Sequence, residues 1–121
     1  MSSLDSPHSL QRRLQRIVGR SLTSVVFIHD YIQFIFDGPI LTTLTLPRLD
    51  HAGIVVSQHC AGYCDGLCSQ IGLTVSSACV TSEGVSIQFE NQAELSVSLL
   101  PADYVGPEAI NFDSDEGKVV A

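Results

Sequence analysis

SVVFIHDYIQFIFDGPILTTLTLP fills residues 24–47, and its alternation of apolar and polar residues decides the fold. In Tyr31–Phe36 every second residue is apolar, which is the period of a strand with one buried side. Asp37-Gly38 follows and favours a tight hairpin turn. Together with the β-branched run Thr23–Ile28 and with Ile40–Leu46, this stretch predicts a three-stranded antiparallel meander.

An amphipathic helix is expected on the N-terminal side of this meander. Over His8–Val18 the apolar residues recur at helical spacing, and Gly19 ends the pattern. A second helical pattern, His59–Ile71, ends at Gly72. Three further runs of strand character follow it, at Leu73–Val80, Val85–Phe89 and Ala93–Leu100. The order helix, strand, strand, strand is therefore expected twice.

The two series match when the chain is shifted by 53 residues, because apolar residues, stop glycines and turn residues then coincide. Representative pairs are Leu14–Leu67, Gly19–Gly72, Leu22–Val75, Phe27–Val80, Phe34–Ile87, Phe36–Phe89, Leu44–Val97 and Leu46–Leu99. We therefore predict an α+β fold of two tandem helix-plus-three-strand-meander repeats, residues 6–47 and 59–101, with pseudo-two-fold symmetry. The six strands are expected to form one curved sheet or a partly open barrel with two helices.

A chain of 121 residues predicts a single domain spanning residues 1–121. The pattern of Asp50–Ser57 is ambiguous. Residues 102–112 lie outside the repeat but carry several apolar side chains, so we expect them to pack against the body. Residues 1–5 and 113–121 are expected to be flexible.

The formal net charge is −7, yet Arg12, Arg13, Arg16 and Arg20 cluster near the N-terminus. An acidic C-terminal half repels phosphate backbones, so no nucleic-acid partner is expected. The basic helix is expected to contact an acidic partner, for which the chain's own tail is a candidate. Only 16% of the residues are charged and 45% are apolar, against about 25% charged in a typical globular chain. This composition predicts a protein partner, with a homodimer as one form of it.

Met1–Arg20 lacks the long apolar core of a signal peptide. No apolar run approaches the ~20 residues that a bilayer-spanning helix needs. The expected location is the cytoplasm, without a membrane partner, and the four cysteines are expected to be reduced thiols.

Cysteine recurs every fourth residue at Cys60, Cys64 and Cys68, and His59 lies beside the first, so these four residues are candidates for a zinc site. The spacing is not that of a C-x2-C knuckle, and small buried hydrophobes are the favoured alternative. We expect neither a metal nor another cofactor. His29-Asp30 suggests a general base oriented by a carboxylate, or simply a polar turn, and the second interpretation is favoured. No phosphate loop, dinucleotide fingerprint or nucleophile elbow is present in the sequence.

Ile35 is expected to face away from the apolar side of its strand, and the 53-residue shift matches it to the polar Gln88. An exposed isoleucine in one half alone indicates a contact surface, whereas cover by a helix or by the C-terminal segment is the alternative. Tyr104, in the C-terminal segment, is the second candidate contact residue.

Four motifs resemble a family of small bacterial proteins of unknown function. They are VGR-x-L-x-x-V-x-F at Val18–Phe27, DYIQFIFDGPIL at Asp30–Leu41, GYCDGLCSQIG at Gly62–Gly72 and DYVGPEAINF at Asp103–Phe112. The resemblance covers roughly residues 15–112 and implies a bacterial, cytosolic protein, but it supplies no activity and no site residues.

These observations favour a non-enzymatic protein–protein interaction module, for which immunity-type neutralisation of a toxin and a scaffold role are concrete forms. A small enzyme or ligand carrier that uses the mouth of a barrel is the first alternative. A cysteine-based metal or redox sensor is the second.

Overall fold

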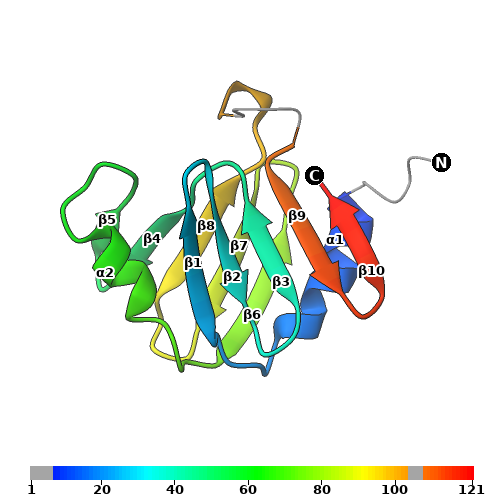
Figure 1. The fold of residues 1–121 in the computed structure, drawn as a ribbon, viewed down its shortest axis with the longest axis horizontal. Coiled ribbons are helices and arrows are strands. Elements are labelled where there is room, and N and C mark those ends of the chain that lie inside the picture. The colour runs from blue at the N-terminus through cyan, green and yellow to red at the C-terminus, as the bar shows by residue number, and fades with distance from the viewer. Residues whose placement is uncertain (1–6, 104–107) are drawn as a thin grey trace.

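The computed structural model describes residues 7–103 and 108–121 (Figure 1). Over these residues the chain forms two α-helices, two short 3₁₀ helices and ten strands. In chain order they are α1 Pro7–Leu14, η2 Gln15–Ile17, β1 Ser24–Ile28, β2 Tyr31–Ile35, β3 Ile40–Thr43, β4 Arg48–His51, β5 Ile54–Val56, α2 Tyr63–Cys68, β6 Val75–Val80, β7 Gly84–Phe89, β8 Glu94–Ser98, η3 Pro101–Asp103, β9 Ile110–Ser114 and β10 Gly117–Val120.

The strands form two five-stranded antiparallel sheets. Sheet 1 has the order β1-β2-β3-β9-β10, and sheet 2 has the order β5-β4-β8-β7-β6. Each sheet thus combines a three-stranded meander from one half of the chain with a hairpin from the other half. The sheets lie face to face, with α2 beside β1 and β4 at one end and α1 beside β6 and β10 at the other (Figure 1).

One apolar core fills the space between the sheets. In β2 and β7 buried side chains alternate with more exposed ones, as expected for strands with one inward side. The largest fully buried side chains are Phe34, Phe36, Phe89, Phe112, Leu10, Leu14, Ile17, Leu22, Leu41, Leu67, Ile87 and Leu95. They come from both halves and both helices, and each stabilises the fold by roughly 1.5–3 kcal/mol through burial.

Backbone contacts join the two halves reciprocally. Ser21 and Thr74, which are 53 residues apart, form an isolated antiparallel bridge. The surrounding bonds are Gly19 N–H to Val75 O (2.9 Å), Gly72 N–H to Leu22 O (2.7 Å), Leu22 N–H to Leu73 O (3.0 Å) and Val75 N–H to Arg20 O (2.9 Å). The first two bonds are equivalent under the 53-residue shift, because Gly19 corresponds to Gly72 and Leu22 to Val75. The last two bonds are equivalent in the same way.

The prediction of six strands in a single curved sheet or barrel is wrong. The segment with an ambiguous pattern forms the hairpin β4–β5, and each half sends its hairpin to the sheet of the other half. Residues 113–121, expected to be flexible, instead form the end of β9 and all of β10. Val119 lies in the core, while the polar residues of this segment lie in the turn or face outward, so the composition concealed a strand.

The two meanders differ by one residue in the turn before their third strand. Phe36 N–H donates to Pro39 O (2.8 Å), whereas Phe89 N–H donates to Ala93 O (2.9 Å), so the second turn is one residue longer. As a result, Leu41 lies opposite Phe34 in the way that Leu95 lies opposite Ile87.

Because the second turn is longer by one residue, the predicted matches of Leu44 with Val97 and of Leu46 with Leu99 are wrong. Thr43 and Thr45 correspond to Val97 and Leu99 instead. Leu44 and Leu46 are only half-buried, and the inward positions of the first meander are taken by Thr43 and Thr45. Thr43 is accommodated because its hydroxyl donates to Ile32 O at 3.0 Å.

Candidate interaction surface

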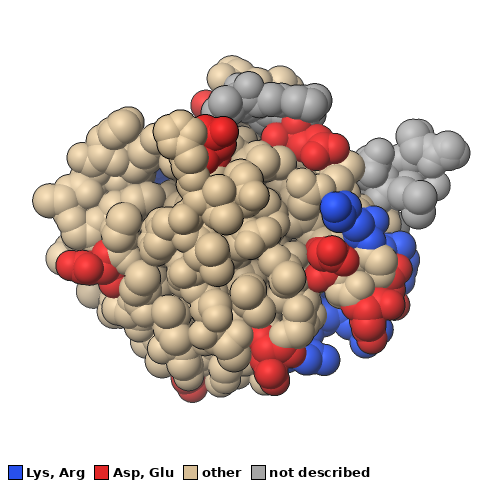
Figure 2. Space-filling view, in the orientation of Figure 1, with Lys and Arg blue, Asp and Glu red and all other residues tan. Residues whose placement is uncertain are grey.

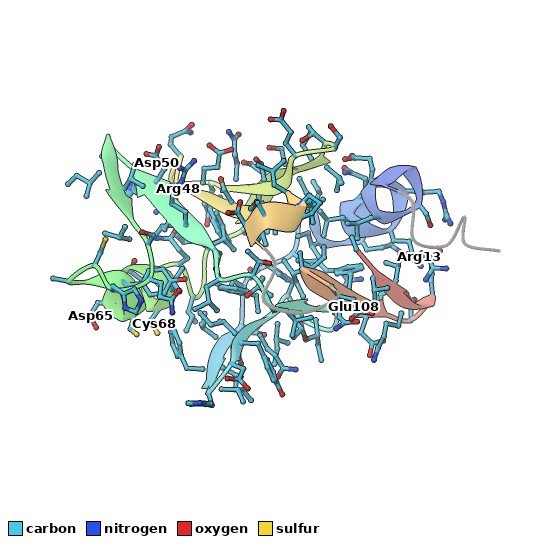
Figure 3. The ribbon with its side chains drawn as sticks, turned by 90° about the horizontal axis from the view of Figure 1, so that it is seen from above. Arg13, Arg48, Asp50, Asp65, Cys68 and Glu108 are labelled. Carbon is cyan, nitrogen blue, oxygen red and sulfur yellow. The ribbon has the colours of Figure 1, made fainter. Side chains whose placement is uncertain are left out.

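The cysteines and histidine proposed as a zinc site do not converge. Among the residues that the structure describes, no group of three or more His, Cys, Asp or Glu side chains is placed to hold a metal ion. Cys64 and Cys68 are exposed rather than buried, so the alternative interpretation of these two as small core residues is wrong, and Cys60 is exposed as well. Figure 3 shows Cys68 and Asp65 on α2, at the opposite end of the molecule from Arg13.

The thiol of Cys60 is more acidic than an ordinary cysteine thiol. Hydrogen bonds from the backbone and then the side chain of Ser57 lower the pKa of Cys60, against a small opposing effect of burial. The Ser57 Oγ and Cys60 Sγ atoms are 3.7 Å apart. This thiol lies in the loop before α2, and its side-chain hydrogen-bond partner is the Ser57 hydroxyl.

The pair His29-Asp30 lies at a two-residue hairpin turn. The Nε2 and Oδ1 atoms are 3.6 Å apart, and the two side chains are 95% and 80% exposed. Water therefore screens the carboxylate from the imidazole, and no other described side chain completes a catalytic arrangement around the pair. The arrangement matches the polar-turn interpretation.

The basic helix contacts the acidic end of the chain. Arg16 Nη2 lies 3.2 Å from Asp115 Oδ1 and 3.5 Å from Glu116 Oε2, and Arg13 Nη1 donates to Glu116 O at 3.2 Å. These contacts attach the turn between β9 and β10 to α1 and η2. They use part of the basic cluster within the molecule, so that cluster does not stand alone as a site for an external acidic ligand.

In the described part of the chain, the outer face of sheet 1 carries no helix and almost no charge. Its outward positions on the first meander are Val26, Ile28, Tyr31, Gln33, Ile35, Ile40, Thr42 and Leu44, which we call the uncharged face. In Figure 2 the centre of this side of the molecule lacks Lys, Arg, Asp and Glu, and the charged side chains lie at its rim. Asp113 and Lys118, cross-strand neighbours on β9 and β10, mark one edge of it.

The outer face of sheet 2 is chemically different at the equivalent positions. These are Cys79, Thr81, Gly84, Ser86, Gln88, Glu94, Ser96 and Ser98, which we call the hydroxyl face. Arg48 and Asp50 on β4 add charges beside it (Figure 3). No position of the hydroxyl face carries a large aliphatic or aromatic side chain, although its strand pairing repeats that of sheet 1.

A shallow hollow lies at the equivalent place on each face. The hollow on the uncharged face has a volume of about 330 Å³, and its lining includes Tyr31, Gln33, Thr42 and Leu44. The hollow on the hydroxyl face has a volume of about 460 Å³, and its lining includes Gly84, Ser86, Ser96 and Ser98. At the equivalent positions the first hollow therefore has an aromatic ring and an aliphatic side chain where the second has a glycine and a serine, while charged residues contribute to the rest of both linings.

Ile35 occupies the uncharged face, as the alternation predicts, and is half-buried beside Ile40 of the next strand. Among residues 7–103 and 108–121, neither a helix nor the C-terminal hairpin covers it, since the hairpin extends the sheet at its edge instead. Tyr104 lies outside the described residues. Sequence reasoning missed the remaining members of the face because a half-exposed valine or leucine on a strand resembles a core residue until the register is known.

Comparison of the chain with protein-family models, with curated proteins and with solved structures finds no significant match. The resemblance to a bacterial family therefore stays a prediction. Within the described part of the chain, no helix is long and apolar enough to cross a bilayer.

Proposed function

We propose that this chain is a non-enzymatic protein-binding module whose contact surface is the uncharged face. The observation that carries the proposal is the contrast between two equivalent sheet faces, of which one is rich in hydroxyl groups and the other carries aromatic and aliphatic side chains. Ile28 of this face is 42% exposed, and depletion of charge at the centre of a surface is typical of interface cores.

The chemistry of the face suits binding to another protein. Tyr31 and Ile35 offer a rigid aromatic ring and an aliphatic side chain, while Gln33 and Thr42 supply hydrogen-bonding groups between them; the Gln33 amide lies 3.3 Å from the Thr42 hydroxyl. Aromatic anchors surrounded by small polar groups are typical of interface centres. We expect a partner surface that is itself apolar and uncharged, because the face has no charge to offer at its centre.

Catalysis on this face has little support. The lining of its hollow consists mainly of hydroxyl, amide and aliphatic groups, and the charged Asp113 and Lys118 stand together at one side. No described nucleophile and general base meet there, which an acyl- or phosphoryl-transfer site needs. Immunity-type neutralisation and scaffolding are the forms of binding that this surface allows us to propose.

Site-specific photo-crosslinking tests the proposal. A benzoylphenylalanine is placed at residue 35 in one variant and at its equivalent, residue 88, in a second variant, and each is expressed in cells of the protein's own source and irradiated. We expect a discrete protein adduct from residue 35 and none from residue 88. Adding Ile40→Lys to the first variant should reduce the yield of the adduct at least tenfold, since a buried unpaired charge opposes association.

Two results would overturn the proposal. One is the absence of any adduct from residue 35 while the variant remains folded by circular dichroism. The other is the same set of adducts from both positions, because a surface that binds no better than the hydroxyl face is not the contact surface.

We also infer that the two halves arose by duplication of one unit, now helix, three strands and hairpin. Support comes from the reciprocal bonds around Ser21 and Thr74 and from the matching strand orders of the two sheets. An experimental structure tests this: residues 14–46 and 67–99 superpose if the unit was duplicated, with a one-residue shift after the turn, and follow different paths otherwise.

A further inference from the structure

Each sheet has a meander strand at its edge, and the two edges are treated differently. The edge of sheet 2 is β6, and α1 covers it with two glutamines. Gln11 Oε1 accepts from Val80 N–H at 2.6 Å, and Gln15 Nε2 donates to Ala78 O at 2.8 Å. These side chains complete the backbone hydrogen bonding that a neighbouring strand would otherwise supply.

The equivalent edge of sheet 1 is β1. Helix α2 lies beside it, as α1 lies beside β6, but no described side chain of α2 hydrogen-bonds to the backbone of β1. Ile28 and Tyr31 flank a two-residue hairpin turn, so they form a hydrogen-bonded pair, and such pairs recur at every second residue. Val25 and Phe27 therefore direct their N–H and C=O groups away from β2, as Ala78 and Val80 do in β6.

Chemistry explains the open edge. The 53-residue shift replaces Gln11 and Gln15 of α1 by Cys64 and Cys68 of α2, whose thiols are exposed and are poor hydrogen-bonding groups. No described side chain hydrogen-bonds to the outward backbone of Val25 or Phe27.

The sequence of β1 carries none of the usual protection of an edge strand. Ser24–Ile28 has no charge, no proline and no bulge within the strand. Phe27 and Ile28 are each 42% exposed although they belong to the meander that builds the core. Partly exposed apolar side chains beside unpaired backbone groups form a template for another strand.

We propose that a second copy of this chain pairs with β1, antiparallel and about a two-fold axis at Val26. In this register Val25 and Phe27 of one copy exchange hydrogen bonds with Phe27 and Val25 of the other. Ser24 then lies opposite Ile28 of the second copy. The two copies of sheet 1 become one continuous ten-stranded sheet, and the two uncharged faces join on the same side of it.

A second copy fits better than an unrelated strand for two reasons. The pairing is self-complementary, because each exposed Phe27 packs across the strands against a valine of the other copy, a favourable aromatic and β-branched pair. In addition, each chain carries a net charge of −7, and the uncharged β1 edge lets two copies meet without bringing carboxylates together.

Oligomeric state measured by light scattering over increasing concentration is the first test. We expect the wild-type chain to be a dimer and Val25→Pro to be a monomer, because proline removes an outward N–H without breaking a bond to β2. Ile28→Lys should weaken the dimer at least tenfold, while the matched change Thr81→Lys, directly after β6, should leave it unaltered. A folded wild-type chain that stays monomeric overturns the proposal, and so does a dimer that Val25→Pro and Ile28→Lys leave intact.

An engineered disulfide tests the register. The background variant carries Cys60→Ser, Cys64→Ser and Cys68→Ser and keeps Cys79, which is the equivalent of Val26 on β6. A second variant exchanges the two residues by Val26→Cys and Cys79→Val. Two copies of residue 26 form a non-hydrogen-bonded pair with Cα atoms about 4.5 Å apart, which a disulfide can bridge.

Under a mild oxidant the exchanged variant should become a covalent dimer on a non-reducing gel, and the background variant should not. Equal cross-linking of both variants, or of neither, overturns the register. These outcomes are independent of the proposed function, because a monomeric Val25→Pro protein that still gives the residue 35 adduct retains its outer-face partner and loses only the second copy.

Discussion

Sheets 1 and 2 share one interior but differ in everything that faces outward. Their inner faces place apolar side chains at equivalent positions, such as Phe36 and Phe89, which are 0% and 1% exposed. Outside, sheet 1 has an uncharged face and an open edge, whereas sheet 2 has a hydroxyl face and an edge covered by α1. The difference teaches that core packing restricts the inward positions of the two sheets to mainly apolar residues. The outward positions are not restricted by packing, so their chemistry can differ between the sheets.

The helices show the same division. Leu14 and Leu67, equivalent residues of α1 and α2, are both buried against the core. The outward positions differ, since α1 uses glutamines that complete β6 and arginines that contact the acidic end of the chain, whereas α2 presents thiols.

The strongest test of the shared interior is a matched pair of cavities, Phe36→Ala and Phe89→Ala. Each should lower the free energy of unfolding by about 3–5 kcal/mol, because a large buried ring is removed from a packed core. Chemical denaturation followed by circular dichroism measures both. A single cooperative transition with similar losses supports one core, whereas two transitions, or a loss below about 1 kcal/mol for either variant, would show that the halves fold separately.

The sequence predicts the inward half of this architecture well. Period-two alternation and the turn at Asp37-Gly38 locate the strands of both meanders, because burial constrains every second residue. The sequence pattern does not predict the hairpins β4–β5 and β9–β10. β5 has only three residues, and the acidic outward positions of β9–β10 resemble a mobile tail.

The candidate site was only partly predictable for a related reason. Ile35 stands out because its equivalent is Gln88, and that contrast extends to the whole face. A single extra residue in the turn before β8 concealed Leu44, because it shifts this residue from an apparent core position to the uncharged face. The open edge of β1 depends on where two helical side chains reach, which no local pattern encodes.

Gln11→Ala removes a side chain that hydrogen-bonds to the edge of β6. Its effect on stability is compared with that of Cys64→Ala at the equivalent position of α2. Removing Gln11 leaves Val80 N–H without its acceptor in a partly buried place, so the free energy of unfolding should fall by about 1–3 kcal/mol. Cys64 is exposed and hydrogen-bonds to no strand, so its replacement should change stability by less than about 0.5 kcal/mol. Thermal unfolding measures both, and equal effects would contradict the asymmetry of the edges.

The smallest effect on stability concerns two buried residues that the 53-residue shift matches, Leu10 in α1 and Tyr63 in α2. The Tyr63 hydroxyl donates to Pro47 O at 2.6 Å, and Tyr63→Phe should lower the free energy of unfolding at pH 7 by about 1 kcal/mol. Burial, with a lesser contribution from Cys64, raises the pKa of Tyr63 from 10.0 to about 12. The folded state therefore favours the neutral phenol.

The sign of the pH dependence follows from this shift. Since the folded pKa is the higher one, the contribution of Tyr63 is fully present below pH 10.0 and is lost as the pH rises through about 12. The wild-type chain should lose stability over this range more steeply than Tyr63→Phe, so the two denaturation midpoints should converge. Midpoints that stay a constant distance apart up to pH 12 would mean that the phenol ionises as freely in the folded chain as in the unfolded one, and that α2 does not seal its end of the core as α1 does with Leu10.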